Sequence, residues 1–150
     1  MKSIEFLKNN NIKFREIHLD EVPVTAQDVE RLYGRALNQV LKTLLVVRGV
    51  LPMLVIIPGD KTIDFKKLEI VTGQGNFRMA ELGEVEDVTG YRIGAVTPFG
   101  IERNIKKIID ESIFDIETVN IGSGKANIGI EIKSADIQKI WDGLVGDIVK

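Results

Sequence analysis

The chain has 150 residues, 44% of them hydrophobic and 28% charged, and its formal net charge is −2, which predicts a single globular domain over residues 1–150. The absence of cysteine excludes disulfides, thiolate nucleophiles and cysteine-bound zinc. The charge argues against the broad basic surface of a DNA-binding protein, and no apolar run reaches membrane-spanning length, so we expect a cytoplasmic protein with no membrane or DNA partner.

The first forty residues predict three helical segments and one strand. Ser3 is a candidate cap for a helix over 3–10, and the alternation that follows predicts a strand over 12–18. Thr25 and Asp28 resemble a capping box, with Asp28 in place of the usual Glu or Gln. The helix that they open is expected to run over 26–32 and to end near Gly34, followed by a short helical segment over 36–40.

The middle of the chain predicts a buried hairpin. Residues 41–47 and 51–57 are rich in Leu and β-branched side chains, and Gly49 lies in the turn between them. A helix capped by Asp64 should follow, running through 68–71 to Gly73.

The second half predicts a short helix over 79–85, three strands over 106–110, 118–121 and 127–132, and a last helix. That helix should begin at Ser134 or Ala135 and carry Trp141 and Leu144. Short helices and strands thus follow one another without a regular βαβ rhythm. We therefore expect an α+β fold: one mixed, partly closed, barrel-like sheet flanked by short helices.

Most conventional catalytic sites are excluded by elimination. The single histidine, His18, cannot build a multi-histidine metal site, and the chain has neither a GxSxG elbow nor a Walker A motif. The turn over 73–76 lacks the strand and third glycine of a dinucleotide fingerprint. Glu84, Glu86 and Asp87 are typical of a solvated acidic face. No cofactor or metal is expected.

Two glycine-rich loops and one lysine remain. The loop from Gly94 to Gly100 could present backbone N–H groups to an oxygen, as an oxyanion hole does, or could be a plain turn. Gly122–Gly124 could likewise be a plain turn or could form a wall of a pocket. Lys42 lies inside an apolar run, where its ammonium must either reach water or serve a purpose.

Several stretches together resemble a known family, and the resemblance spans about 25–140. They are VLKTL at 40–44; IPGD at 57–60 with ID at 63–64 and KL at 67–68; TGY at 89–91 leading to GAVTPFG at 94–100; IDES at 109–112; and Gly124 with Asp136 twelve residues later. The pattern is similar to that of the YbaK/ProX family, the freestanding relatives of the editing (insertion) domain of bacterial prolyl-tRNA synthetase.

This resemblance implies a hydrolase that removes a small, wrongly attached amino acid from tRNA in trans. The usual substrates carry alanine or cysteine, commonly on proline tRNA. The partners implied are the 3′ acceptor end of mischarged tRNA and prolyl-tRNA synthetase. An aminoacyl ester is already activated, so a water, a ribose hydroxyl or the substrate's own side chain could attack it while the enzyme supplies orientation and oxyanion stabilisation.

The resemblance also implies the site residues. The family's lysine corresponds to Lys42, which would position the tRNA end, and its GxxxP loop supplies the other catalytic residues, Gly94, Ala95, Val96, Thr97 and Pro98. The substrate-binding residues are expected to be Thr43, Phe99, Gly100, Gly122, Ser123, Gly124 and Asp136. Cations such as Lys61, Arg78 and Arg103 are further candidates for contacts with tRNA.

Two departures leave alternatives open. The family often has Ser-Ala-Gly where this chain has Gly122-Ser123-Gly124, and some members carry a histidine in this region, so the amino-acid preference is open. A non-catalytic module that binds a tRNA end or a nucleotide, and a protein that docks on a synthetase, are the alternative functions.

Overall fold

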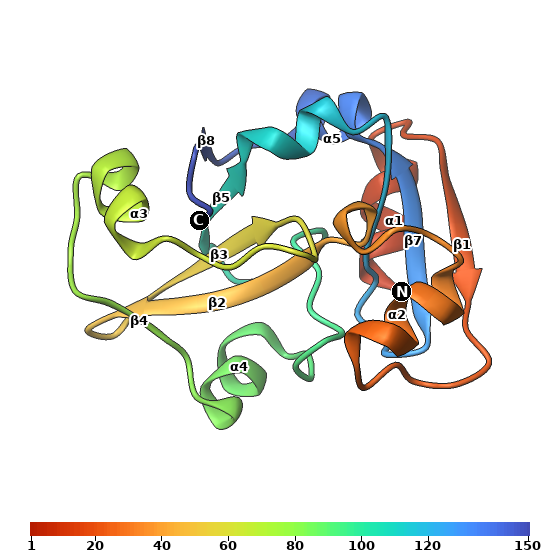
Figure 1. Cartoon of the computed structure of the whole chain (residues 1–150), viewed down its shortest axis with the longest axis horizontal. Helices are drawn as coiled ribbons and strands as arrows, with labels where there is room; N and C mark the ends of the chain where they lie inside the picture. Colours follow the sequence, from red (N-terminus) through yellow and green to blue (C-terminus); the bar gives the residue numbers. More distant parts are fainter.

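Two β-sheets share one hydrophobic core in the computed structural model, which describes residues 1–150 (Figure 1). The elements in chain order are α1 (Lys2–Asn9), β1 (Phe14–His18), α2 (Ala26–Tyr33), the 3₁₀ helix η1 (Leu37–Gln39), β2 (Lys42–Arg48), β3 (Leu51–Ile57), α3 (Phe65–Thr72), β4 (Phe77–Met79), α4 (Leu82–Thr89), β5 (Lys106–Asp110), the 3₁₀ helix η2 (Glu111–Asp115), β6 (Thr118–Gly122), β7 (Ile128–Lys133), α5 (Ser134–Ile140) and β8 (Leu144–Gly146). No helix has the length and apolar character needed to cross a bilayer.

The larger sheet has the strand order β4-β2-β3-β5-β8 and is mixed, because β2 pairs antiparallel with β3 and β4 while β5 pairs parallel with β3 and β8. Side chains alternate between its two faces, with Leu45 in one apolar cluster and Val46 in the other. Helix α3 covers one face and α4 the other (Figure 1). The central strands are therefore buried on both sides, as their continuous apolar sequence predicts.

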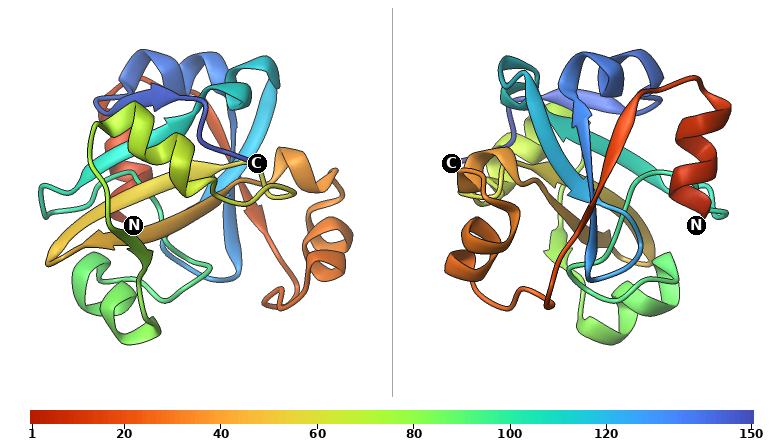
Figure 2. Two further views of the ribbon diagram at one scale, coloured as in Figure 1. Left: turned by 60° about the vertical axis from the view of Figure 1, so that its left-hand side comes forward. Right: turned by 90° about the vertical axis from the view of Figure 1, so that its right-hand side faces the viewer.

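The smaller sheet is antiparallel and has the order β1-β7-β6. Helices α1 and α2 lie on opposite sides of it in the right-hand view of Figure 2. Ile4 and Leu7 bind α1 to the shared core. A single bridge, between Val40 and Asn120, joins this sheet to the start of β2.

The expected fold is confirmed in class and corrected in its sheet. The fold is α+β and the larger sheet is mixed, but there are two sheets and no closed barrel. Closure fails because β4 pairs with β2 only from Val46 to Arg48, so the first half of β2 has no neighbour on that side except the bridge at Val40.

Three expected details are wrong. The segment over 79–85 divides into the end of β4 and the start of α4, because Met79 pairs with Val46. The last helix ends at Ile140, and Leu144 lies on β8 because it pairs with Ile108 of β5; the indole N–H of Trp141 donates to the Leu144 carbonyl. Ser3 is no cap: it is buried inside α1, and its hydroxyl donates to the carbonyl of Ser123.

The other local signals are confirmed. Thr25 and Asp28 form the capping box of α2, and the carboxylate of Asp64 accepts the N–H groups of Lys66 and Lys67 at the start of α3. Gly34 ends α2 in the left-handed region at φ +63°.

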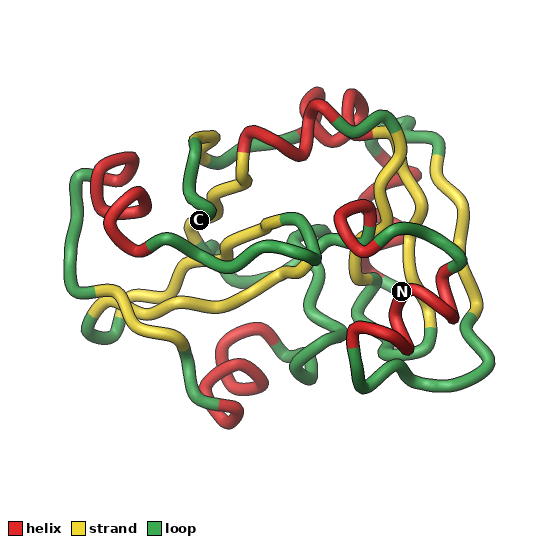
Figure 3. Tube along the Cα trace, in the orientation of Figure 1, coloured by secondary structure: helices red, strands yellow, loops and turns green.

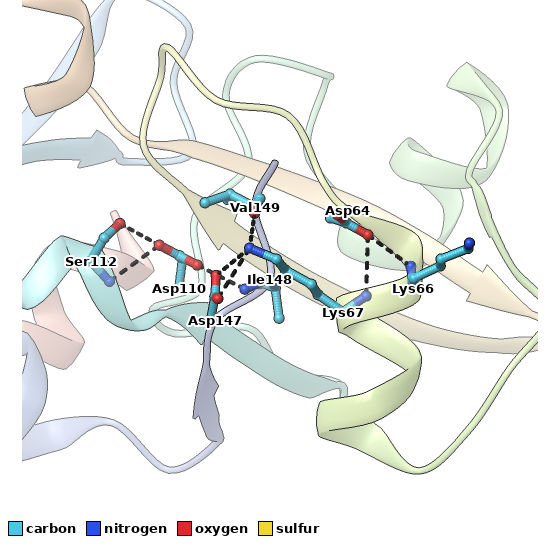
Figure 4. Close-up of polar contacts among 8 residues, drawn as sticks. All are labelled: Asp64, Lys66, Lys67, Asp110, Ser112, Asp147, Ile148 and Val149. Carbon is cyan, nitrogen blue, oxygen red and sulfur yellow. Dashed lines mark hydrogen bonds and ion pairs between the residues drawn. The ribbon is translucent and has the colours of Figure 1, made fainter.

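A buried carboxylate fastens the C-terminal segment to the larger sheet (Figure 4). Asp110 is fully buried at the end of β5 and accepts the N–H of Ile148 at 3.0 Å and the N–H and hydroxyl of Ser112. Lys67 of α3 donates to the carbonyl of Val149 at 2.8 Å and pairs with the exposed carboxylate of Asp147. Because a buried charge requires such partners, Asp110 couples β5, η2 and the chain end.

We predict that Asp110→Ala lowers the free energy of unfolding by about 2–3 kcal/mol, because it leaves buried N–H groups without an acceptor. Urea denaturation followed by circular dichroism measures the loss. Asp147→Ala is the matched control: its ion pair is exposed, so it should cost less than about 1 kcal/mol. Equal losses in the two variants would contradict the role given to Asp110.

Candidate active site

A pocket of about 420 Å³ lies where the edge of the larger sheet approaches the smaller one. Thirteen of the 21 residues that line it are hydrophobic, and none is Asp, Glu or His. Its walls come from five regions: the segment 23–26 with α2, the chain from η1 into β2, Gly59, the loop 93–96, and the segment 121–128 between β6 and β7. The volume is in the range of small-molecule sites.

Strand β2 presents unpaired backbone to this pocket. The N–H of Leu41 donates to Asn120 and the carbonyl of Leu45 accepts from Ala80, so these residues direct their backbone groups away from β3. Thr43 lies between them with the same orientation, and on the side away from β3 no strand pairs with β2 at this position. The N–H and C=O of Thr43, which lines the pocket, are therefore available to a ligand. Its hydroxyl oxygen is buried and has no hydrogen-bond partner.

The two glycine-rich loops of the sequence lie against each other beside this strand edge. The N–H of Gly124 donates to the carbonyl of Ala95 at 2.9 Å. A side chain at Gly122 would overlap the carbonyl oxygen of Val96, so only glycine permits this approach. The loop between α4 and β5 is long (Figure 3), and these contacts hold its pocket-facing part in place.

The held loop leaves two N–H groups without a partner. Gly94 and Val96 both line the pocket, and the backbone N–H of neither makes a hydrogen bond within the protein. Gly94 has φ +84°, a conformation that a side chain would strain. Unpaired N–H groups on a fixed loop are the donors from which oxyanion holes are built.

Lys42 begins β2 at the rim of the pocket. Its ammonium donates to the backbone carbonyl of Lys61. Burial lowers the pKa of Lys42, and the nearby carboxylate of Asp60 opposes that shift. The ammonium is thus held at one place rather than extending freely into water, and it keeps donors for a ligand.

Helix α2 supplies the opposite wall. The ring of Tyr33 packs directly on Gly129 of β7, where any side chain would overlap it. Burial raises the pKa of Tyr33, so its hydroxyl remains a donor at neutral pH. Val24 and Ile93 are 87% and 60% exposed and form an apolar rim.

The structure brings together only part of the predicted site. Lys42, Thr43, Gly94, Val96 and Gly122 line the pocket. The remaining loop residues support it from behind, since Ala95, Thr97 and Pro98 are buried and do not line it.

The other predicted site residues lie elsewhere. The ring of Phe99 stacks on Phe6 in the core with centroids 5.9 Å apart. Gly100, Ser123 and Gly124 border a second hollow, and Asp136 lies in a third one beside Lys139 of the same helix.

Sequence reasoning missed several pocket residues. The apolar ones on α2 and η1 carry no signal beyond ordinary amphipathic spacing. Gly59 entered the sequence analysis only as part of the IPGD stretch, yet a side chain there would overlap the carbonyl oxygens of Leu37 and Val40. Lys125 was not singled out, although it lines both the pocket and the second hollow. The contacts that place these residues in the pocket are made with segments distant in the sequence, so no local pattern indicates them.

Comparison with known proteins identifies the family. The model of the aminoacyl-tRNA editing domain matches residues 21–140. The chain belongs to the aminoacyl-tRNA editing domain family. The matched segment contains every pocket-lining residue, and the resemblance to the YbaK/ProX family is confirmed.

Individual relatives of this editing domain agree. The chain is 24% identical over 149 residues to an Enterococcus faecalis protein named "Putative Cys-tRNA(Pro)/Cys-tRNA(Cys) deacylase EbsC", covering 97% of this chain and 91% of that protein. It is 30% identical over 113 residues to a proline–tRNA ligase of Aquifex aeolicus, covering 75% of this chain but only 20% of the ligase. A crystal structure of "hypothetical protein APE2540" matches over 100% of both chains, with a TM-score of 0.92 and 25% identity.

We predict that Gly122→Ala displaces the editing domain's loop 94–96, because the new side chain would overlap the Val96 carbonyl. The free energy of unfolding should fall by about 1–3 kcal/mol, and amide resonances of the loop should shift in a ¹⁵N correlation spectrum. Gly83→Ala in α4 is the control: nothing lies within 4 Å, so helix propensity should stabilise it by about 0.5–1 kcal/mol. Unshifted loop amides in Gly122→Ala would contradict this contact.

Proposed function

We propose that this chain is an aminoacyl-tRNA deacylase that acts in trans, in the cytoplasm, on tRNA carrying a small, wrongly attached amino acid. The observation that carries the proposal is the pocket in which the unpaired N–H groups of Gly94 and Val96, the open backbone of Thr43 and the ammonium of Lys42 come together. Membership of the editing-domain family supports it.

The chemistry is hydrolysis of the ester between the amino acid and the 3′-terminal ribose. The attacking oxygen adds to the ester carbonyl, and the N–H groups of Gly94 and Val96 accommodate the negative charge that develops on the carbonyl oxygen. The ester C–O bond then breaks, and the ribose oxygen takes up a proton. The products are a free amino acid and uncharged tRNA.

No side chain of the pocket acts as a general base in this proposal. The lining contains no carboxylate and no histidine. Such a group is not required, because an aminoacyl ester is already activated toward attack. A water molecule attacks the carbonyl, oriented by polar groups of the bound substrate, and its proton passes to the departing ribose oxygen; catalysis rests on orientation and oxyanion stabilisation. The backbone carbonyl of Thr43 accepts a hydrogen bond from the substrate's α-ammonium group and so orients the ester toward the loop.

Lys42 positions the tRNA end. Its ammonium is fixed by the Lys61 carbonyl beside the pocket rim, where it attracts the terminal phosphate as a point charge. Selectivity for a small amino acid, alanine or cysteine on proline tRNA, arises from exclusion by size. Tyr33 and Leu37 close the wall that a larger side chain would meet.

A deacylation assay with proline tRNA charged separately with alanine, cysteine and proline tests the function. We expect rapid release of alanine or cysteine and slow release of proline. No release from any of them would overturn the proposal. Tight binding of uncharged tRNA without turnover would instead favour a binding module, and capture of prolyl-tRNA synthetase with an inert pocket would favour a docking role.

We predict that Lys42→Ala lowers kcat/KM for deacylation about 10²-fold, the order of loss when one fixed polar contact to the reacting end is removed. Lys42→Met, which retains the apolar stem, should lose as much. Lys66→Ala, an exposed lysine on α3 outside the pocket, is the matched control and should retain wild-type activity. Activity of Lys42→Ala at the wild-type level would contradict the role of the ammonium.

The same role sets a pH dependence. Because burial lowers the pKa of Lys42, its charged form is lost, as the pH rises, sooner than that of an exposed lysine. We therefore predict that wild-type activity, relative to Lys42→Arg, falls on the alkaline side as the pH rises through the lowered pKa. Rates on both proteins, corrected for spontaneous ester hydrolysis, measure this ratio; a ratio that rises with pH would indicate a neutral lysine acting as base.

A further inference from the structure

A second hollow of about 460 Å³ adjoins the pocket. It lies between the N-terminus, the end of α4, the segment 100–103 and the turn 123–125. Lys125 lines both the hollow and the pocket. The two cavities are thus neighbours along one path over the protein surface, with an exposed lysine where they meet.

The ring of Tyr91 walls this junction. A side chain at Gly124 would approach the ring to 2.7 Å, and Gly124 itself has φ +103°. Glycine at this position therefore lets the turn pass close beneath the ring. The turn that fixes the pocket loop through Gly122 thus also forms the floor of the hollow through Gly124.

The two cavities differ in chemistry. The pocket is mainly apolar, whereas only 4 of the 14 residues lining the hollow are hydrophobic. An apolar pocket suits an amino-acid side chain, and a polar hollow suits a charged, hydrated group. A ligand that extends from one into the other would have an apolar end and a polar continuation.

The hollow also holds unpaired positive charge. Of its cations, Lys2 pairs with Glu102, whereas Arg103 and Lys125 are exposed and form no ion pair. Most other arginines of the chain are engaged: Arg15, Arg31, Arg35 and Arg78 each pair with a carboxylate. Asp87 is the one acidic side chain of the hollow that lacks a cationic partner, so the charge balance favours an anion.

We propose that this hollow binds the phosphodiester backbone of the single-stranded acceptor end, on the tRNA side of the terminal nucleotide. The inference rests on the proposed function, because the aminoacylated nucleotide must occupy the pocket. Lys125 contacts the phosphate at the junction as a point charge, and Arg103 contacts a more distant phosphate with its planar fork. Two local contacts of this kind explain how a chain of net charge −2 can bind RNA.

The test compares two substrates that differ only in the part that would cross the hollow. One is aminoacyl-tRNA and the other is the same amino acid esterified to adenosine, which reaches the pocket alone. We expect Arg103→Ala to raise KM for aminoacyl-tRNA about tenfold and to leave hydrolysis of aminoacyl-adenosine unchanged. For tRNA, the slope of log KM against the logarithm of the salt concentration should be smaller by about 0.7, because one phosphate contact has been removed.

Lys125→Ala should reduce the salt slope for tRNA by a similar amount. Lys13→Ala is the matched control, because Lys13 is an exposed, unpaired lysine in the third hollow, which shares no lining residue with the other two. It should leave KM and the salt slope at their wild-type values. Equal effects of Arg103→Ala and Lys13→Ala, or equal losses on both substrates, would overturn the inference.

Failure of the proposed function would look different. If neither substrate is hydrolysed, the deacylase proposal fails, and the hollow is then tested by binding alone. Fluorescence anisotropy with uncharged tRNA should still show weaker, less salt-dependent binding for Arg103→Ala than for wild type. Binding equal to wild type would overturn the inference independently of any activity.

Discussion

The open edge of β2 at Thr43 is the constraint on which the rest of the site depends. On one side β2 is paired with β3 along its whole length, but on the other side it meets β6 only through the bridge from Val40 and β4 only from Val46 onward. A continuous ladder would have closed the sheet and filled the pocket. The interruption leaves one residue's backbone donor and acceptor available between two fixed neighbours, a more rigid arrangement than a flexible loop provides.

The shape of the pocket beside β2 depends on segments whose backbones approach one another closely. Gly59, Gly122 and Gly129 each stand where a side chain would overlap another segment: the carbonyls before β2, the carbonyl of Val96, and the ring of Tyr33. None of the three has a positive φ. Glycine is therefore required at these positions because a side chain would not fit, and not because the backbone is left-handed. The pocket walls are therefore positioned by contacts that exist only in the folded chain, and the loop that carries Gly94 and Val96 is held by the same contacts.

This distinction explains what the sequence could predict. Caps, turns and the buried hairpin depend on neighbours in the chain, and the capping box at Thr25 and the cap at Asp64 were predicted correctly. The short strand β4 was missed, and its last residue, Met79, was placed in a predicted helix, because three residues carry no periodicity and pair only through tertiary contact. The motif pattern located Lys42 and the Gly94 loop, yet it also included Asp136, which the fold places in a different hollow. The spacing of two residues along the chain does not determine whether the fold brings them to the same cavity.

The junction between the sheets also has a cost in stability. The hydroxyl of Thr43 and both amide atoms of Asn120 are buried without hydrogen-bond partners, and such groups typically cost about 1–3 kcal/mol each. Both residues lie where β2 leaves β6, next to the pocket rather than in the centre of either apolar cluster. The well-packed clusters on both faces of the larger sheet, and the carboxylate of Asp110 that fastens the chain end, offset this local loss. Three of the four buried side-chain atoms without a partner lie at this junction, the fourth being Nε of Arg48, and such a concentration is expected where a requirement other than folding determines the residues.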